Sequence, residues 1–478
     1  MSSLSTASLS PEAPAKLSAE VLAELPPEIV RTDADDLAPH LTDWRGQKTG
    51  SADVLLLPRS TQDVVEIVKW AGRHGVGLVP QGGNTGLVGG GVPEPAPHGP
   101  VAILSLRRMN AIESIDPAGL VLVAGAGAIL ANVHSAAEEA GCRFPLSLGA
   151  KGSATIGGLV STNAGGVQVL RHGTMRALVL GLEAVLPDGS VLDQLSALRK
   201  DNSGYDLKQL LIGAEGTLGI VTRVALRLAP ALTTRCTGWA GLDNPGQALA
   251  LLQRLRAEAG ETVESFELIA SDALDLTLHH MPALKSPLEG AHRYHVLIEL
   301  GAPVSILESV LMAGIEAGEV EDAAIASSDA QADSMWNIRE TIPEAEKRDG
   351  GSIKNDISVA VADVPAFHAE AVQKLQSAYP GTRPFVFGHL GDGNLHWNIL
   401  PPPGAAPTWL KQEGEQARRL LHDLIAQHHG SISAEHGIGT LKAAELRRLG
   451  NPAKLAAMRA IKSALDPQGI MNPAKLFA

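Results

Sequence analysis

The sequence is short of cysteine, positive charge and aromatic residues. Its 478 residues include two cysteines, Cys142 and Cys236, which are too few for a disulfide framework and lack the paired spacing of a thiolate zinc site. This usage fits a reducing compartment. Lys and Arg total 39 against 52 Asp and Glu, a formal net charge of −13, which argues against a surface built to bind nucleic acid.

Signals for export and membrane insertion are also missing. The first 30 residues show neither a basic stretch followed by an apolar one nor an Arg-rich transit helix. No segment approaches the ~18 consecutive apolar residues that a membrane-spanning helix needs. We therefore expect a cytoplasmic protein that has no membrane span and no nucleic-acid partner.

Glycine, by contrast, is abundant: 50 residues, concentrated in three loops at 80–91, 149–166 and 202–222. Loops of small residues allow backbone amides to point into one concavity, which suits a phosphate or pyrophosphate. A single loop of this kind is explained equally well as an ordinary turn, but three in one domain favour contact with a ligand. The dinucleotide fingerprint G-x-G-x-x-G and the P-loop motif are absent, which disfavours nicotinamide and P-loop enzymes.

Apolar periodicity predicts alternating strands and helices over the first half of the chain. A capping box at Ser60 and Asp63 begins one helix, and another is expected at 129–141. Strands are expected at 53–58, 75–80, 101–106, 120–125, 178–186 and 219–228. This pattern predicts an α/β domain, followed after Pro230 by a domain of longer helices and short strands. We divide the chain into an N-terminal tail and lead-in at 1–45, the α/β domain at 46–230, the second domain at 231–405 and a C-terminal segment at 406–478.

Two histidines in the segment 384–400 predict a metal site. Apolar alternation on both sides of Gly391–Asn394 predicts a β-hairpin with a four-residue loop, in which His389 faces His396. Paired residues have Cβ atoms ~4.5–5.5 Å apart, close enough for two imidazoles to hold one ion. A one-residue slip would separate them, and the alternative is a pair that is merely packed or exposed. Glu435 offers a carboxylate, and two histidines with one carboxylate suit zinc or another divalent ion.

A helix, a glycine turn and a strand are expected at 335–359, with Arg339 on the helix and Lys354 on the strand. The two cations could converge on a carboxylate, Arg as a planar fork and Lys as a point charge. The alternative is two solvated basic side chains among acidic neighbours.

The three glycine-rich loops resemble those of a known protein superfamily. The strings PQGGNTGLVGG, GAKGSATIGGLVSTNAGG and LIGAEGTLGIVT resemble the FAD-binding domain of the vanillyl-alcohol oxidase and p-cresol methylhydroxylase superfamily. Within it, the chain is similar to the D-2-hydroxyacid dehydrogenases, which include D-2-hydroxyglutarate, D-lactate and glycolate dehydrogenases. The resemblance implies an α+β protein: a two-subdomain FAD-binding domain of mixed α/β layers, an α+β cap domain, and a helical C-terminal segment that closes the active site.

The resemblance assigns the cofactor residues by position. Gly82 to Gly86 would wrap the pyrophosphate, the second loop would line the flavin, and the third would lie along the adenosine part. The full set comprises Pro80, Gly82, Gly83, Asn84, Thr85, Gly86, Leu87, Gly149, Ser153, Ile156, Gly157, Gly158, Thr162, Asn163, Gly165, Glu215, Gly219, Ile220, Val221 and Asn472. Some members tether FAD through a histidine in the first loop, and because Asn84 and Thr85 stand there we expect non-covalent FAD.

The resemblance also assigns the reacting groups. It implies a divalent metal, with zinc as the first choice, on His389, His396 and Glu435, and makes His436 the catalytic base. Adjacent residues of a strand point to opposite faces, so Glu435 and His436 can serve one site only if the backbone bends there. Arg339, Lys354 and Asn398 would bind the substrate. Where relatives specific for hydroxyglutarate are expected to have a hydroxyl residue, this chain has Pro343, which puts a five-carbon diacid in doubt.

The predicted function is FAD-dependent oxidation of a D-2-hydroxyacid, D-2-hydroxyglutarate or D-lactate first, to the 2-oxoacid. Electrons would pass to a separate acceptor, which is an electron-transfer flavoprotein, a quinone or a cytochrome, and a homodimer is left open. The alternatives are a flavin oxidase or a glycolate dehydrogenase on the same fold, a metal-dependent hydrolase without redox chemistry, and a flavin subunit that only relays electrons.

Overall fold

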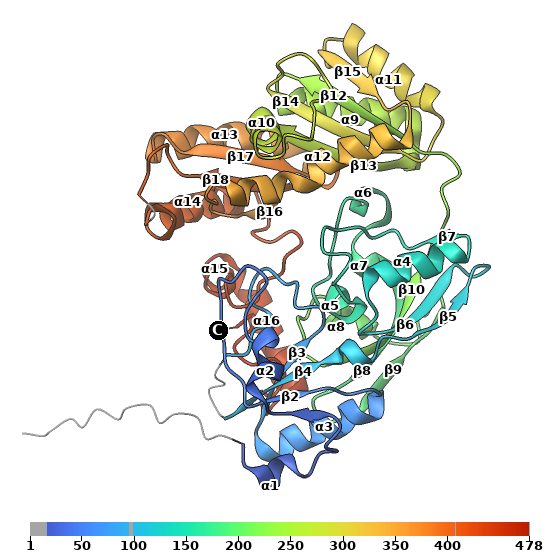
Figure 1. Cartoon of the computed structure of the whole chain (residues 1–478), viewed down its shortest axis with the longest axis vertical. Coiled ribbons are helices and arrows are strands. Elements are labelled where there is room, and N and C mark those ends of the chain that lie inside the picture. Colours follow the sequence, from blue (N-terminus) through green and yellow to red (C-terminus); the bar gives the residue numbers. More distant parts are fainter. Residues whose placement is uncertain (1–16, 95–98, 407, 478) are drawn as a thin grey trace, which may run out of the picture.

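The computed structural model describes residues 17–94, 99–406 and 408–477, so residues 1–16 of the predicted N-terminal tail lie outside it. Figure 1 shows two lobes. We call the upper one, from Cys236 to Gln427, the cap, and the rest of the chain the lower lobe. The α+β class is confirmed, since helices and separate sheets make up both lobes.

The lower lobe begins with a four-stranded sheet, ordered β1-β2-β4-β3, in which β2 and β3 run parallel to β4. The capping box of α3 is present: Ser60 Oγ accepts from the Asp63 amide, and the Asp63 carboxylate accepts from the Ser60 amide. The predicted helix and strands of this region are thereby confirmed. The elements are α1 (Ala19–Leu22), β1 (Val30–Arg31), α2 (Ala34–Leu37), η1 (Ala38–His40), β2 (Val54–Leu56), α3 (Thr61–His74), β3 (Gly77–Gln81), β4 (Val101–Ser105) and η2 (Leu106–Arg108).

A second, fully antiparallel sheet completes the lower lobe, ordered β5-β6-β10-β8-β9. The predicted strands at 120–125, 178–186 and 219–228 are confirmed as β6, β8 and β10, and the helix at 129–141 as α4. The elements are β5 (Ile112–Asp116), β6 (Val121–Gly125), α4 (Leu130–Glu139), β7 (Cys142–Arg143), α5 (Ile156–Ser161), α6 (Val169–His172), α7 (Met175–Leu178), β8 (Val179–Val185), β9 (Val191–Gln194), α8 (Lys208–Leu211), β10 (Ile220–Arg227) and β11 (Ala229–Pro230), which pairs with β7.

The cap is a seven-stranded antiparallel sheet, ordered β15-β12-β14-β13-β17-β18-β16, with helices on both faces. Its strands are β12 (Cys236–Leu242), β13 (Val263–Ala270), β14 (Tyr294–Leu300), β15 (Asp322–Ile325), β16 (Asp356–Ser358), β17 (Arg383–Gly388) and β18 (Asn394–Leu400). Its helices are α9 (Pro245–Ala259), η3 (Gly260–Thr262), α10 (Ser271–His280), α11 (Val304–Glu316), α12 (Asp329–Arg348), η4 (Val361–Asp363), α13 (Val364–Ala378), η5 (Leu390–Asp392), η6 (Trp409–Lys411) and α14 (Glu413–Gln427).

The two faces of the cap sheet carry different residues, because side chains alternate along each strand. Trp397 and Ile399 of β18 pack in the core that α9, α11, α13 and α14 cover. Phe385 and Phe387 of β17 pack instead against α10 and α12. His396 pairs with Phe387, and Asn398 with Phe385, so both polar residues lie on the α12 face.

The chain returns from the cap to the lower lobe at its C-terminal end. After α14, residues 430–441 cross between the lobes, and α15 (Ala443–Leu449) and α16 (Pro452–Leu465) follow. Leu78 donates its amide to Ile470 O at 2.7 Å, and Asn472 donates to Leu78 O at 2.8 Å. The red C-terminal elements therefore lie beside the blue N-terminal ones in Figure 1.

A buried carboxylate, Glu264 on β13, joins the cap to the lower lobe. Arg143 donates to its two oxygens at 3.0 and 2.7 Å, Arg171 donates to it as well, and His172 lies 3.5 Å away. Burial works against ionisation, but the hydrogen bonds and charges of these partners lower the pKa of Glu264 to about 2.

We expect Glu264→Gln to lower the free energy of unfolding by about 2–4 kcal/mol, because it removes a buried charge that holds two arginines. Chemical denaturation of the variant and of Glu258→Gln, which changes an exposed carboxylate on α9, measures this difference. Since the folded pKa of Glu264 lies below its ordinary value of 4.5, the contribution is complete above that pH and is lost as the pH falls toward 2. A stability gap between wild type and variant that is unchanged at low pH would contradict this account.

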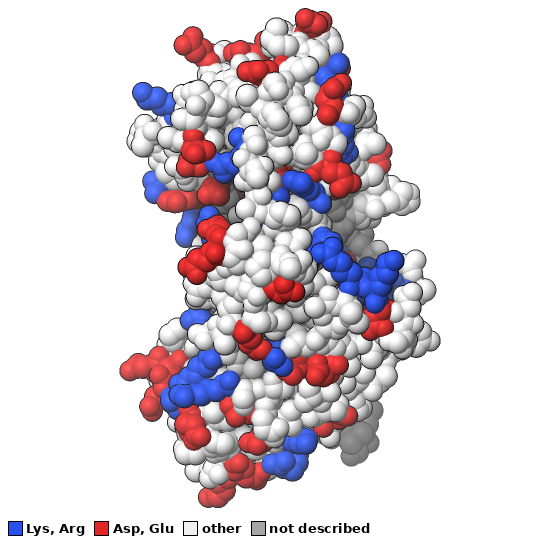
Figure 2. All heavy atoms as spheres, turned by 90° about the vertical axis from the view of Figure 1, so that its right-hand side faces the viewer, with Lys and Arg blue, Asp and Glu red and all other residues white. Residues whose placement is uncertain are grey.

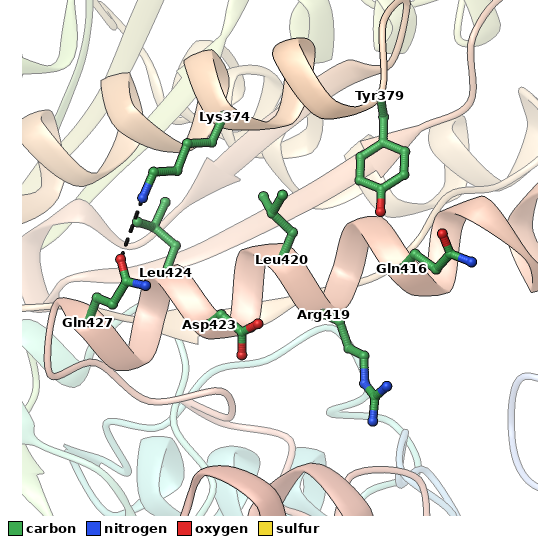
Figure 3. Close-up of a pocket in the computed structure, with 8 residues that line it drawn as sticks. All are labelled: Lys374, Tyr379, Gln416, Arg419, Leu420, Asp423, Leu424 and Gln427. Atoms are coloured by element: carbon green, nitrogen blue, oxygen red, sulfur yellow. Dashed lines mark hydrogen bonds between the residues drawn. The ribbon is translucent and has the colours of Figure 1, made fainter.

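Figure 2 shows acidic and basic side chains interspersed over the visible face. No helix of the described residues is long and apolar enough to cross a membrane. A groove of about 480 Å³ lies between α13 and α14, lined by residues such as Lys374 and Arg419, but none of the predicted site residues lines it (Figure 3).

Candidate active site

The predicted hairpin that carries His389 and His396 is present, but its register differs from the prediction. His396 pairs with Phe387 instead of His389, which lies beyond the end of β17. The connection between the strands is longer than the predicted four-residue loop: β17 ends at Gly388, which adopts φ +144°, and β18 begins at Asn394. Since the shift is two residues, His389 keeps to the same face, and the two imidazole centroids are 5.8 Å apart.

The segment that carries Glu435 and His436 is bent, as a shared site requires. Their two consecutive amides both donate to Asp356 Oδ2 at 2.9 Å, and left-handed Gly437 follows. The Glu435 side chain thereby turns toward His389, with 3.6 Å between Glu435 Oε1 and His389 Nε2. The imidazole of His436 stacks on that of His396, with ring centroids 6.0 Å apart.

The four residues predicted as metal ligands and base are thus brought together from three separate segments. One donor atom each from His389, His396 and Glu435 lies within 4.8 Å of the others. Asp356, His396 and His436 form a second such group. Two imidazoles and one carboxylate are the donor set that divalent zinc accepts with a position left open, so these residues fit a catalytic metal.

Two carboxylates of this site were missed by the sequence reasoning. Glu267 on β13 accepts from His389 Nδ1 at 2.6 Å and from Arg339 Nε at 2.8 Å. Asp356 begins β16 and pairs with His396. Acidic residues within an otherwise apolar strand were the available signal, such as the two glutamates of VESFELIA at 263–270, because a charge is buried there only with partners.

The charges of these groups are set by one another. Burial favours neutral Glu267, but His389 and Arg339 lower its pKa to about 2. Burial likewise opposes a charged His389, yet Glu267 and Glu435 raise its pKa to about 9. A carboxylate on Nδ1 holds a histidine in the tautomer whose Nε2 can face a metal.

The base candidate stands in a different environment. Burial lowers the pKa of His436 to about 4, with Asp356 opposing, so its imidazole is neutral at pH 7. Burial also works against ionisation of Asp356, but His436, Lys442 and the Glu435 amide hold the pKa of its carboxyl well below the usual range. The imidazole of His436 is therefore free to take a proton beside a fixed negative charge.

The predicted substrate ligands also lie on the α12 face of the sheet. Arg339 is buried, with its guanidinium carbon 4.9 Å from the centre of the Phe387 ring, so it is not a solvated surface cation. Lys354 precedes β16 instead of lying on it. Asn398 accepts from the Asn355 amide at 2.9 Å. Pro343 is exposed within α12, one turn from Arg339.

The glycine loops of the lower lobe lie against each other. A Cβ at Gly82 would be 2.0 Å from Thr155 Oγ1, and one at Gly83 would be 2.0 Å from Ser153 O, so the first and second loops tolerate no side chain there. The second loop also reaches the crossing segment 430–441, since a Cβ at Gly165 would lie 3.1 Å from Glu435 Oε1. The predicted flavin-lining loop thus ends at the predicted metal ligands.

The third loop and the C-terminus are tied together. The Glu215 carboxylate accepts from the amides of Ile438 and Gly439, both at 2.8 Å, while Asn472 Nδ2 donates to Glu215 O at 2.6 Å. These two predicted cofactor residues therefore also anchor the segment that follows His436. Gly219 leads directly into β10, where Ile220 and Val221 are buried.

Two family models match separate parts of the chain. Residues 52–194 match the model described as "FAD binding domain", and residues 232–476 match "FAD linked oxidases, C-terminal domain". The chain is 39% identical to mitochondrial D-2-hydroxyglutarate dehydrogenase of Arabidopsis thaliana, over 93% of this chain and 78% of that protein. This chain belongs to the FAD-dependent D-2-hydroxyacid dehydrogenase family. It is an oxidoreductase that acts on CH–OH groups.

Other relatives extend this family assignment. D-2-hydroxyglutarate dehydrogenase of Xanthomonas citri pv. viticola is 38% identical over 94% of each chain. Among solved structures, p-cresol methylhydroxylase superposes with a TM-score of 0.74 at 16% identity, over 96% of this chain and 95% of that one. A 4-ethylphenol oxidase of Gulosibacter chungangensis gives 0.72 at 18% identity, covering 97% and 98%. The structural matches confirm the expected fold.

The lower lobe of this family member fits FAD. Thr155 Oγ1 and Asn472 Oδ1 are buried without a partner within the described residues; Thr155 lies in the second glycine loop, and Asn472 is itself a predicted cofactor residue. Asn84, Asn163 and Glu215 adopt left-handed backbone conformations, which turn the chain sharply in each of the three loops. Unpaired donors and acceptors along close-approaching backbone suit a polar cofactor.

Proposed function

We propose that the chain oxidises a D-2-hydroxyacid to the 2-oxoacid, with D-2-hydroxyglutarate and D-lactate as the candidate substrates. The observation that carries this proposal is the close approach of Gly165 to Glu435, where an added Cβ would lie 3.1 Å from the carboxylate; it brings the second glycine loop to the metal and base candidates. The relatives are named D-2-hydroxyglutarate dehydrogenases, which supports a 2-hydroxyacid as the substrate. Their names also make the diacid D-2-hydroxyglutarate one of the two candidates.

In this proposal His389, His396 and Glu435 hold a divalent metal, zinc first, and the glycine loops hold FAD without a covalent bond. FAD bound there would supply the acceptor for the hydride from C2, and a divalent ion would supply a Lewis acid that makes the 2-hydroxyl more acidic. His436 takes the hydroxyl proton as the C–O bond becomes a carbonyl. Arg339 orients the carboxylate, and Glu267 fixes both Arg339 and His389.

The remaining parts of the proposal concern the setting of the reaction. A separate acceptor, an electron-transfer flavoprotein, a quinone or a cytochrome, would reoxidise the flavin, and the location would be cytoplasmic. An oxidase or a glycolate dehydrogenase would use the same residues. A metal-dependent hydrolase would have no use for the FAD loops, so their close approach to Glu435 favours redox chemistry.

Anaerobic mixing of the purified holoenzyme with a panel of D- and L-2-hydroxyacids tests the function. We expect a yellow protein whose flavin absorbance bleaches with at least one D-acid and not with its L-enantiomer, since metal, base and FAD approach C2 from fixed directions. Stopped-flow absorbance near 450 nm measures the rate. Bleaching by no hydroxyacid, or by both enantiomers equally, would refute the proposal.

A further inference from the structure

Lys354, a cation predicted to bind the substrate, is already paired with a buried carboxylate of the chain itself. Glu346 on α12 is fully buried, and Lys354 Nζ donates to its Oε2. Asn398 Nδ2 donates to its two oxygens at 3.0 and 3.1 Å, and Ser352 Oγ donates to Oε1. Three donors, one of them charged, thus converge on an internal anion in the way they would on a substrate carboxylate.

Glu346 lies next to the metal candidates along the sheet. On α12 it follows Arg339 by seven residues, which puts both on one face of the helix. On β18, Asn398 follows His396 by two residues, so it is on the same face and roughly 7 Å farther along the strand. Arg339 lies over Phe387, which pairs with His396, and Glu346 bonds to Asn398. A substrate held at the metal would extend its distal carbons toward Glu346.

Positive charge in this distal region is matched by negative charge. Burial lowers the pKa of Lys354 while Glu346 opposes that shift, as expected for a cation paired with a buried anion. Arg45 of the lower lobe is attracted to Glu346 as well, and to Asp43 and Asp356. Both cations thus already face carboxylates of the chain itself, which a second substrate carboxylate would have to displace.

We propose that Glu346 sets the substrate class of this chain: it takes the place of a distal carboxylate and selects D-2-hydroxy monocarboxylic acids over diacids. This inference rests on the proposed function and chooses between its two candidate substrates. A diacid would have to displace Glu346 from Lys354 and bring a second negative charge beside it.

The test compares D-2-hydroxyglutarate with its neutral isostere, in which the distal carboxylate is an amide, and with D-lactate. For the wild-type holoenzyme we expect kcat/KM at least tenfold higher for the amide and for D-lactate than for the diacid. Glu346→Gln keeps the shape and frees the charge of Lys354, so the ratio of amide to diacid should fall at least tenfold, mainly through KM for the diacid. Glu340→Gln, an exposed carboxylate of the same helix, should leave the ratio unchanged.

The wild-type comparison keeps the inference falsifiable even if Glu346→Gln does not fold. A wild-type enzyme that uses the diacid as well as or better than the amide overturns the role of Glu346, while bleaching by any D-acid still supports the proposed function. A folded Glu346→Gln variant with an unchanged ratio also overturns it. If no hydroxyacid bleaches the flavin, the proposed function fails and this inference falls with it.

Discussion

His436→Ala is expected to keep its FAD and to lose flavin reduction by substrate, with the rate falling about 10²- to 10⁴-fold. The neutral imidazole of His436 lies beside ionised Asp356 and stacks on His396, at the point where the chain crosses from cap to lower lobe. Removing it leaves the hydroxyl proton without an acceptor. Stopped-flow reduction under anaerobic conditions measures the loss, and the absorbance spectrum reports the bound flavin.

His279→Ala is the matched control, since His279 is exposed at the end of α10 and remote from these groups. Its flavin content and its rate should equal those of the wild type. Unchanged reduction in His436→Ala would assign the base to another residue. Loss of FAD from that variant would instead mean that His436 supports the fold of the crossing segment.

Prolonged dialysis against a chelator is expected to lower turnover about 100-fold or more while the flavin stays bound. The reason is that a metal contributes several kcal/mol by polarising the hydroxyl, and each 1.4 kcal/mol of barrier is tenfold in rate. The glycine loops predicted to hold FAD belong to the lower lobe, and none of the three metal candidates, His389, His396 and Glu435, is among their residues. Metal analysis by mass spectrometry, run beside the activity assay, measures occupancy.

Adding back zinc or another divalent ion should restore the rate. His396→Ala should be low in metal as purified, whereas His134→Ala should retain it, because His134 bonds to Leu146 O within the lower lobe. Full activity in a preparation shown to be free of metal would remove the metal from the reaction.

Much of the fold could be predicted because the signals are local. Ser60 and Asp63 cap α3 through atoms three residues apart, and the apolar runs of β2, β3 and β4 need no distant partner to be recognised. The hairpin of His389 and His396 was predicted with a register two residues off, yet its faces were right because side chains repeat every two residues. The glycine loops could likewise be recognised, because their composition is a local feature of the sequence.

The sequence by itself determined the kinds of groups present: the residues at His389, His396, Glu435 and His436, and the loops for FAD. Only the tertiary structure decided which charges meet. Glu267 reaches His389 across 122 positions, and Asp356 reaches the Glu435 amide across 79. Lys354 was predicted to await a substrate carboxylate, and the structure gives it Glu346. The pairing of buried charges depends on which elements pack together, and no local pattern in the chain encodes that.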